Sequence, residues 1–217
     1  MHKAYRGMGM EGSIARWYDR TTRRSMPEFQ RHAQQFEEML PEGGDILEVA
    51  PGPGFLSIEL AKRGRHRVTG LDISKTFVEI AGKNAEAARV NVDFRQGNAS
   101  QMPFADNSFD FLVCRAAFKN FSEPVRAIAE MQRVLRPGGK GVIIDLRRDA
   151  SMAMISSYVD GLGVNLWNRL FMKLAFRFML LRRAYTHAQF TDMLAQVPFT
   201  RTWIEGNSVG LEVWFEK

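Results

Sequence analysis

Glycines and acidic residues follow two short apolar runs in this sequence. The run at residues 45–50 contains Glu48 and leads into Pro51-Gly52-Pro53-Gly54, and the run at 67–71 ends at Asp72. Glycines allow a backbone to approach a ligand closely, and a helix that begins after such a turn presents free N–H groups. A carboxylate about 20 residues beyond the turn can accept both hydroxyls of a ribose. The spacing therefore predicts a site for a nucleotide-type ligand.

Three features argue against a nicotinamide cofactor at this site. The third glycine of the dinucleotide pattern falls at Ser57, and an acid, Glu48, closes the first run where an apolar residue is expected. The chain also shows no second half that could hold the nicotinamide.

Strand-like and helical stretches alternate through the middle of the chain. Strands are predicted at 45–50, 67–71, 90–96, 109–114 and 141–146, with helices at 55–63, 74–88 and 124–135 between them. Such βαβ units form parallel sheets whose ligands gather at the carboxyl ends of the strands. Two further strands, at 200–204 and 210–216, are expected to form a closing hairpin. We therefore expect an α/β fold with a doubly wound, mostly parallel seven-stranded sheet.

The length of 217 residues fits one domain. Within it we expect a helical N-terminal cap at 1–40 and a ligand-binding core at 45–148. A helical insertion or lid would follow the fifth strand at 151–184, and a helix with the strand hairpin would fill 185–217. Residues 13–40 and 152–183 both read as helical.

Composition excludes some classes of protein. A single cysteine, Cys114, cannot form an intramolecular disulfide and suits a reducing compartment. No apolar leader and no long uncharged apolar stretch occur, so a cytoplasmic protein is predicted. The net charge of +6 is compatible with an anionic partner, but the longest basic runs are pairs, which favours an ordinary basic surface.

Five motifs occur in a set order along the chain. They are Glu48-x-Ala-x-Gly-x-Gly, Leu71-Asp72-Ile-Ser, Gly97-Asn98-Ala-x-x-Met102-Pro-Phe, Asp106-x-Ser-Phe109-Asp110 and Leu135-Arg-Pro-Gly-Gly139. This order resembles the class I S-adenosylmethionine-dependent methyltransferases, particularly the small-molecule branch that includes the ubiquinone and menaquinone methyltransferases. The resemblance covers residues 45–148 closely, the chain ends loosely and 151–184 hardly at all. It implies a Rossmann-like methyltransferase fold.

The resemblance also implies which residues bind S-adenosylmethionine. The turn from Glu48 to Gly54, with Ala50 and Gly52, would wrap the methionine part of the cofactor. Asp72 would hold the ribose. The remaining contacts would be Ile73 and Met102 on the two faces of the adenine, Asn98 and Ala99 at its edge, and Arg115 at the methionine end.

Two positions depart from the family's usual pattern. Ala50 stands where a glycine is usual, and alanine is acceptable there only if its φ is negative. Asn98 stands where aspartate is more frequent, but its carbonyl can still accept a hydrogen bond from the adenine amino group.

Methyl transfer from a sulfonium asks little of the protein beyond alignment and exclusion of water. A general base is needed only when the acceptor must lose a proton, and the candidates are Tyr18, Asp145 and His187. Phe118, Phe171 and Phe178 are candidate contacts to the acceptor. No His, Cys and Asp residues have metal-ligand spacing, so no metal is expected.

Residues 162–183 carry a basic stripe of Arg169, Lys173 and Arg177 beside a broad apolar face. This segment is interpreted as a lid over a lipophilic acceptor, as a surface for an anionic membrane, or as plain packing. The sequence leaves these alternatives open, and it does not indicate an oligomeric state.

The leading functional hypothesis is methyl transfer to a small apolar or aromatic acceptor. The alternatives are another group transfer from the same cofactor, or a regulatory protein that binds S-adenosylmethionine without turnover. Methylation of nucleic acid is disfavoured, because Cys114-Arg-Ala-Ala-Phe118 replaces the Asn/Asp-Pro-Pro-Tyr/Phe motif of base-flipping enzymes.

Overall fold

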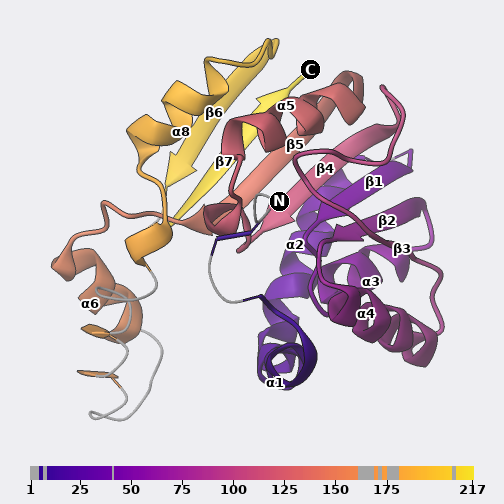
Figure 1. Cartoon of the computed structure of the whole chain (residues 1–217), viewed down its shortest axis with the longest axis horizontal. Coiled ribbons are helices and arrows are strands. Elements are labelled where there is room, and N and C mark those ends of the chain that lie inside the picture. Colours follow the sequence, from indigo (N-terminus) through magenta and orange to yellow (C-terminus); the bar gives the residue numbers. More distant parts are fainter. Residues whose placement is uncertain are drawn as a thin grey trace.

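The computed structural model describes residues 5–6, 9–40, 42–160, 169–170, 173–174, 181–206 and 209–217. Its centre is a seven-stranded sheet in the order β3-β2-β1-β4-β5-β7-β6 (Figure 1). The strands are β1 Gly44–Val49, β2 His66–Asp72, β3 Asp93–Gln96, β4 Phe109–Arg115, β5 Leu135–Leu146, β6 Arg201–Gly206 and β7 Gly210–Glu216. Only β7 runs antiparallel to its neighbours, β5 and β6, within this sheet. The predicted doubly wound, mostly parallel sheet is confirmed.

The register of the parallel strands brings their carboxyl ends together. Val49 of β1 lies between Leu71 of β2 and Cys114 of β4, and Cys114 in turn pairs with Ile143 of β5. The residues that follow these positions therefore share one edge of the sheet. This is the edge at which parallel α/β sheets bind their ligands.

Helices cover both faces of the sheet (Figure 1). On one face lie α2 (Met26–Met39), α3 (Phe55–Ala61) and α4 (Lys75–Ala88), and on the other α5 (Pro124–Val134) and α8 (His187–Leu194). Phe36 of α2 is fully buried, with its ring 5.0 Å from that of Phe111 on β4. On the opposite face Phe190 of α8 is equally buried against Phe118, which lies in the short helix η2 (Phe118–Asn120). Each face thus has an apolar core of its own.

The N-terminal cap is two helices where the sequence predicted one helical stretch over 13–40. The first is α1 (Gly12–Thr22), and a 3-10 turn, η1 (Arg23–Ser25), separates it from α2. Pro27 stands in the first turn of α2, a position where its missing N–H costs nothing and where it stops the preceding helix from continuing.

The region after β5 begins with α6 (Met152–Asp160) and ends in η4 (Leu181–Arg183). Of the predicted helix over 162–183, residues 169–170 and 173–174 are helical. Phe171, Arg177 and Phe178 lie outside the described residues. Within the part of the chain that the structure describes, no helix is long and apolar enough to cross a membrane.

Candidate functional site

The turn after β1 forms the floor of the site. Gly52 and Gly54 both have positive φ, at 55° and 80°. A Cβ on Gly54 would lie 2.6 Å from the ring of Phe94 and 2.9 Å from the Cβ of Ala81. Glycine is therefore required at Gly54 by both backbone and space. The turn ends directly in α3, whose first N–H groups point toward the same edge of the sheet.

Ala50 adopts a φ of +58°, so the expectation that this alanine would have negative φ is wrong. Its N–H donates to the carbonyl of Leu71 at 2.7 Å, which holds the chain as it leaves β1. Ala116, the first residue after β4, has a φ of +57° and donates to the carbonyl of Ile144 in the same way. Strained residues of this kind cluster at functional sites, and here two of them border one sheet edge.

We expect Ala50→Gly to stabilise the protein by about 0.5–1 kcal/mol. The left-handed conformation destabilises the folded protein by about 1–2 kcal/mol when the residue is alanine. Glycine removes this strain, but its greater freedom in the unfolded chain offsets about 0.5–1 kcal/mol of the gain. Urea denaturation measures the difference. Ala117, whose φ is −123°, is the matched control, and Ala117→Gly should lower the stability. A lower denaturation midpoint for Ala50→Gly would contradict the assigned strain.

Asp72 connects the end of β2 to the glycine turn. Its buried carboxylate accepts the N–H of Gly52 at 3.0 Å on one oxygen and the N–H of Ser74 at 2.9 Å on the other. Burial raises the pKa of Asp72 to about 6, although these hydrogen bonds oppose the shift. Each oxygen keeps a second lone pair, so the carboxylate can still accept two hydroxyls.

Glu48 lies in β1 beneath the turn and is 3% exposed. The hydroxyl of Ser57 donates to its carboxylate. Burial raises the pKa of Glu48 to about 7, while Ser57 and the charge of Arg115 lower it. Ser57 stands where the dinucleotide pattern has its third glycine. Its role here is to donate a hydrogen bond to Glu48, an acid that does not occur in that pattern.

Arg115, at the end of β4, points toward α2. Its guanidinium lies 2.6 Å from the carboxylate of Glu28 and 4.6 Å from the centre of the Phe29 ring. The Nε atom is buried without a hydrogen-bond partner. An unsatisfied buried donor of this kind can bind a carboxylate.

The residues predicted to contact adenine differ in their exposure. Ile73 is 37% exposed, which leaves its side chain open to a ligand, and Ala99 is half-buried. The side chain of Asn98 accepts the N–H of Ser100 at 2.9 Å and so closes a turn. Met102 is buried in the core, with its N–H donating to Glu130 at 2.6 Å. Both have structural roles here, and their contacts with adenine stay predictions.

Of the three candidate bases, only Tyr18 lies against the glycine turn. A Cβ on Gly52 would be 3.9 Å from its ring, which packs edge-on against Phe77 at 5.8 Å. Asp145 at the end of β5 is buried and binds the ammonium of Lys119 at 2.7 Å, so its carboxylate is already engaged. His187 is exposed at the start of α8.

The candidate acceptor contacts are only partly described. Phe118 is fully buried between Phe121, Tyr185 and Phe190, at ring distances of 5.3, 5.8 and 5.4 Å. Phe171 and Phe178 lie outside the described residues. Among the described residues no cluster of His, Cys, Asp and Glu side chains could hold a metal ion.

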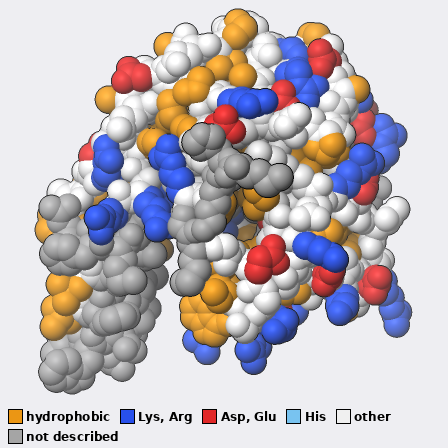
Figure 2. Space-filling view, viewed as in Figure 1, with side chains coloured by type: hydrophobic (Ala, Val, Ile, Leu, Met, Phe, Trp, Pro, Cys, Tyr) orange, Lys and Arg blue, Asp and Glu red, His pale blue; other side chains and the backbone are white. Residues whose placement is uncertain are grey.

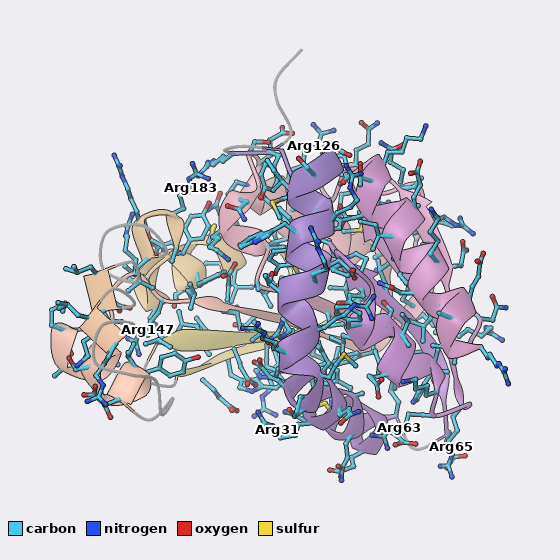
Figure 3. The ribbon with its side chains drawn as sticks, turned by 90° about the horizontal axis from the view of Figure 1, so that it is seen from below. Arg31, Arg63, Arg65, Arg126, Arg147 and Arg183 are labelled. Carbon is cyan, nitrogen blue, oxygen red and sulfur yellow. The ribbon has the colours of Figure 1, made fainter. Side chains whose placement is uncertain are left out.

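The sequence motifs did not indicate Tyr5, whose backbone lies against the segment that follows β4. Its backbone forms a bridge with Phe121, and the neighbouring Arg6 N–H donates to Asn120 at 2.7 Å. Burial raises the pKa of Tyr5. The charge of Arg183 opposes this rise, and Asp72 and Asp145 add to it. Arg183 lies on the side of the molecule that carries α6 (Figure 3). Tyr5 thus lies among groups from the ends of β2 and β5, although no periodicity in the N-terminal residues predicts it.

Comparison with known proteins agrees with this geometry. Residues 47–143 match the family model of the methyltransferase domain. A demethylmenaquinone methyltransferase from Deinococcus radiodurans is 34% identical over 122 residues, which cover 56% of this chain and 51% of that protein. A ubiquinone/menaquinone biosynthesis C-methyltransferase from Bdellovibrio bacteriovorus is 39% identical over 106 residues, 48% of this chain and 44% of that protein. The chain thus spans about half the length of these curated relatives.

A solved structure extends the likeness to nearly the whole chain. A SAM-dependent methyltransferase from Aquifex aeolicus superimposes with a TM-score of 0.71 at 19% identity, over 94% of this chain and 97% of that one. At this identity the match establishes the fold. The glycine turn, Glu48 and Asp72 lie at the edge of the sheet where that fold binds its ligands. Residues 47–143 therefore match the methyltransferase-domain family, and about half of this chain is similar to quinone methyltransferases.

Proposed function

We propose that this protein transfers the methyl group of S-adenosylmethionine to a small, apolar, aromatic acceptor of the quinone type. The observation that carries the proposal is the pair of buried acids, Glu48 and Asp72, on either side of a glycine turn. The likeness to demethylmenaquinone and ubiquinone/menaquinone methyltransferases supports the class of acceptor. We further propose that residues 1–40, 45–148, 151–184 and 185–217 act as cap, cofactor core, lid and closing elements of one domain.

The residues present fit the cofactor. Glu48 is a buried carboxyl with a raised pKa, as expected for an acid whose positively charged partner is a ligand. The amino group of the methionine part of the cofactor would supply that positive charge. The unpartnered Nε of Arg115 suits the carboxylate of the same methionine. Asp72 retains two free lone pairs for the ribose hydroxyls, and Ile73 offers an open apolar side chain to the adenine.

When bound, S-adenosylmethionine supplies a methyl group already activated by its sulfonium. The remaining task of the protein is to align the acceptor and to exclude water. Tyr18 and Tyr5 approach this edge from the N-terminal residues. The hydroxyl of Tyr5 can donate a hydrogen bond to an oxygen of the acceptor. Asp145 is held by Lys119 and positions η2 rather than serving as a free base.

Titration calorimetry tests the choice of cofactor. We expect S-adenosylhomocysteine to bind and NAD and NADP to give no measurable heat, because Ser57 and Glu48 occupy positions where dinucleotide binding needs glycine and an apolar residue. Binding of a nicotinamide cofactor without S-adenosylhomocysteine would overturn the proposed function.

Product analysis then distinguishes the alternatives. Incubation with S-adenosylmethionine and reduced short-chain quinones should release S-adenosylhomocysteine and a singly methylated quinol. Methylthioadenosine as the product would favour a different transfer from the same cofactor. Tight cofactor binding without product over a broad panel of acceptors would favour a regulatory protein.

A further inference from the structure

Helix α1 turns two different faces to its surroundings. Its inner face contains Ala15, which is fully buried, and Tyr18, which lies against the glycine turn. Its outer face contains Trp17, which is 59% exposed. Trp17 is the most exposed of the large apolar side chains in the described part of the chain. An exposed indole that is flanked by basic side chains has the composition of a helix face that lies at a membrane interface.

Three basic side chains lie on the same side of the chain as this indole. Arg16, Arg20 and Arg24 are exposed and recur every four residues beside Trp17. Within the described residues none of the three has an ion pair with an acid, and the one side-chain bond in this group runs from Arg20 to the carbonyl of Arg16. The three acids nearest in sequence are engaged elsewhere, and one of them, Glu28, binds Arg115 at 2.6 Å. Asp19 binds Arg23 and Asn84, and Glu11 accepts the N–H groups of Lys75 and Thr76.

We propose that the outer face of α1 and of the η1 turn that follows it docks on an anionic lipid surface. This face is formed by Arg16, Trp17 and Arg20 of α1 and Arg24 of η1. Tryptophan prefers the interface between water and lipid, and arginines beside it bind anionic headgroups while their stems cover apolar surface. A helix that carries such a face lies in the plane of the interface. The charge of the face selects anionic lipids.

The position of α1 favours a membrane over nucleic acid as the partner. The helix lies at the lower edge of the molecule in Figure 1, and Figure 2 shows apolar and basic side chains gathered there. Two described residues beyond α6, Leu170 and Leu174, are also exposed, by 53% and 47%. Exposed apolar side chains suit lipid and not phosphate backbone. This choice rests on the proposed function, because a lipophilic quinone would reach the site from the same membrane.

Residues 162–183, for which a membrane surface is one of three interpretations, carry basic side chains that are partly paired. Arg169 and Lys173 share the single carboxylate of Asp160, at 3.4 and 3.0 Å, so one of their two positive charges is offset. Arg177 lies outside the described residues. The arginines of α1 have no such partner, which makes α1 the stronger source of attraction to anionic lipid.

Vesicle sedimentation of the full chain tests the proposal without cofactor or acceptor, so its result does not depend on methyl transfer. The probes are phosphatidylcholine vesicles with and without phosphatidylglycerol. We expect binding only to the anionic vesicles, with partitioning reduced about a hundredfold in the Arg16→Gln/Arg20→Gln/Arg24→Gln variant. Trp17→Ala should reduce partitioning about tenfold, because the indole no longer enters the interface. Both variants keep good helix formers in α1.

The matched control removes the same charge from elsewhere on the surface. Arg126→Gln/Lys140→Gln/Arg201→Gln changes exposed residues on α5, β5 and β6, far from α1 (Figure 1), and should bind vesicles as the wild type does. An equal loss in this control would show a general effect of net charge and overturn the proposal. Binding to an RNA oligonucleotide but not to vesicles would also overturn it, as would full vesicle binding by both α1 variants. Binding of S-adenosylhomocysteine by every variant separates failure of this proposal from failure of the cofactor site.

Discussion

Replacing Asp72 by alanine should weaken the binding of S-adenosylhomocysteine about a hundredfold. Its carboxylate is buried at the end of β2 and has one free lone pair on each oxygen for the two ribose hydroxyls. Two hydrogen bonds to a charged group contribute about 3 kcal/mol together, which corresponds to that factor. Titration calorimetry on the folded variant measures the loss.

The same substitution also removes bonds inside the protein, so a control must separate binding from folding. Asp110 accepts the N–H of Asp45 at 2.8 Å at the amino ends of the strands, far from the site. Asp110→Ala should cost stability and leave the affinity unchanged. Asp72→Asn keeps one acceptor for the turn and should still lose most of the affinity. Unchanged affinity in both Asp72 variants would remove this residue from the site.

Much of the sheet follows from local pattern. The parallel strands β1, β2, β4 and β5 each contain an apolar run, while β3 at the sheet edge does not. Short connections between such strands leave few ways to arrange βαβ units. Glu48, Gly52, Gly54 and Asp72 were therefore expected at one edge, and the structure places them there. Sequence spacing is sufficient here because all four residues belong to two neighbouring strands and their following turns.

The features that sequence missed depend on contacts between distant segments. The positive φ of Ala50 is set by its bond to Leu71 across the sheet, and no local rule predicts a strained alanine. Tyr5 is held by a bridge to Phe121, more than half the chain away. Met102 follows a recognisable motif, yet its burial is decided by α5, where Glu130 accepts its N–H. Tertiary context decides each of these positions.

The affinity for S-adenosylhomocysteine should rise at least tenfold between pH 5.5 and pH 8, an estimate based on two acids that titrate in this range. Burial raises the pKa of Asp72 to about 6 and that of Glu48 to about 7. A ligand with a positive amino group and hydroxyl donors binds the ionised acids better, so binding lowers both pKa values and releases protons. Calorimetry in buffers of different ionisation enthalpy measures the released protons.

Glu48→Gln should separate the destabilisation that this buried acid causes from its contribution to ligand binding. A carboxyl whose pKa is raised from 4.5 to about 7 is neutral in both folded and unfolded protein below pH 4. Between these two pKa values the carboxyl is ionised in the unfolded protein but still neutral in the folded protein. The free energy of unfolding of the unliganded wild type therefore falls as pH rises, by about 3 kcal/mol in total above pH 7. The variant should therefore be more stable than the wild type at pH 8 and similar at pH 4. It should also bind the ligand more weakly at pH 8 and release fewer protons. If the variant were less stable than the wild type at pH 8, Glu48 would be an acid that stabilises the fold through its hydrogen bond with Ser57. Its assignment as the partner of a cationic ligand would then be wrong.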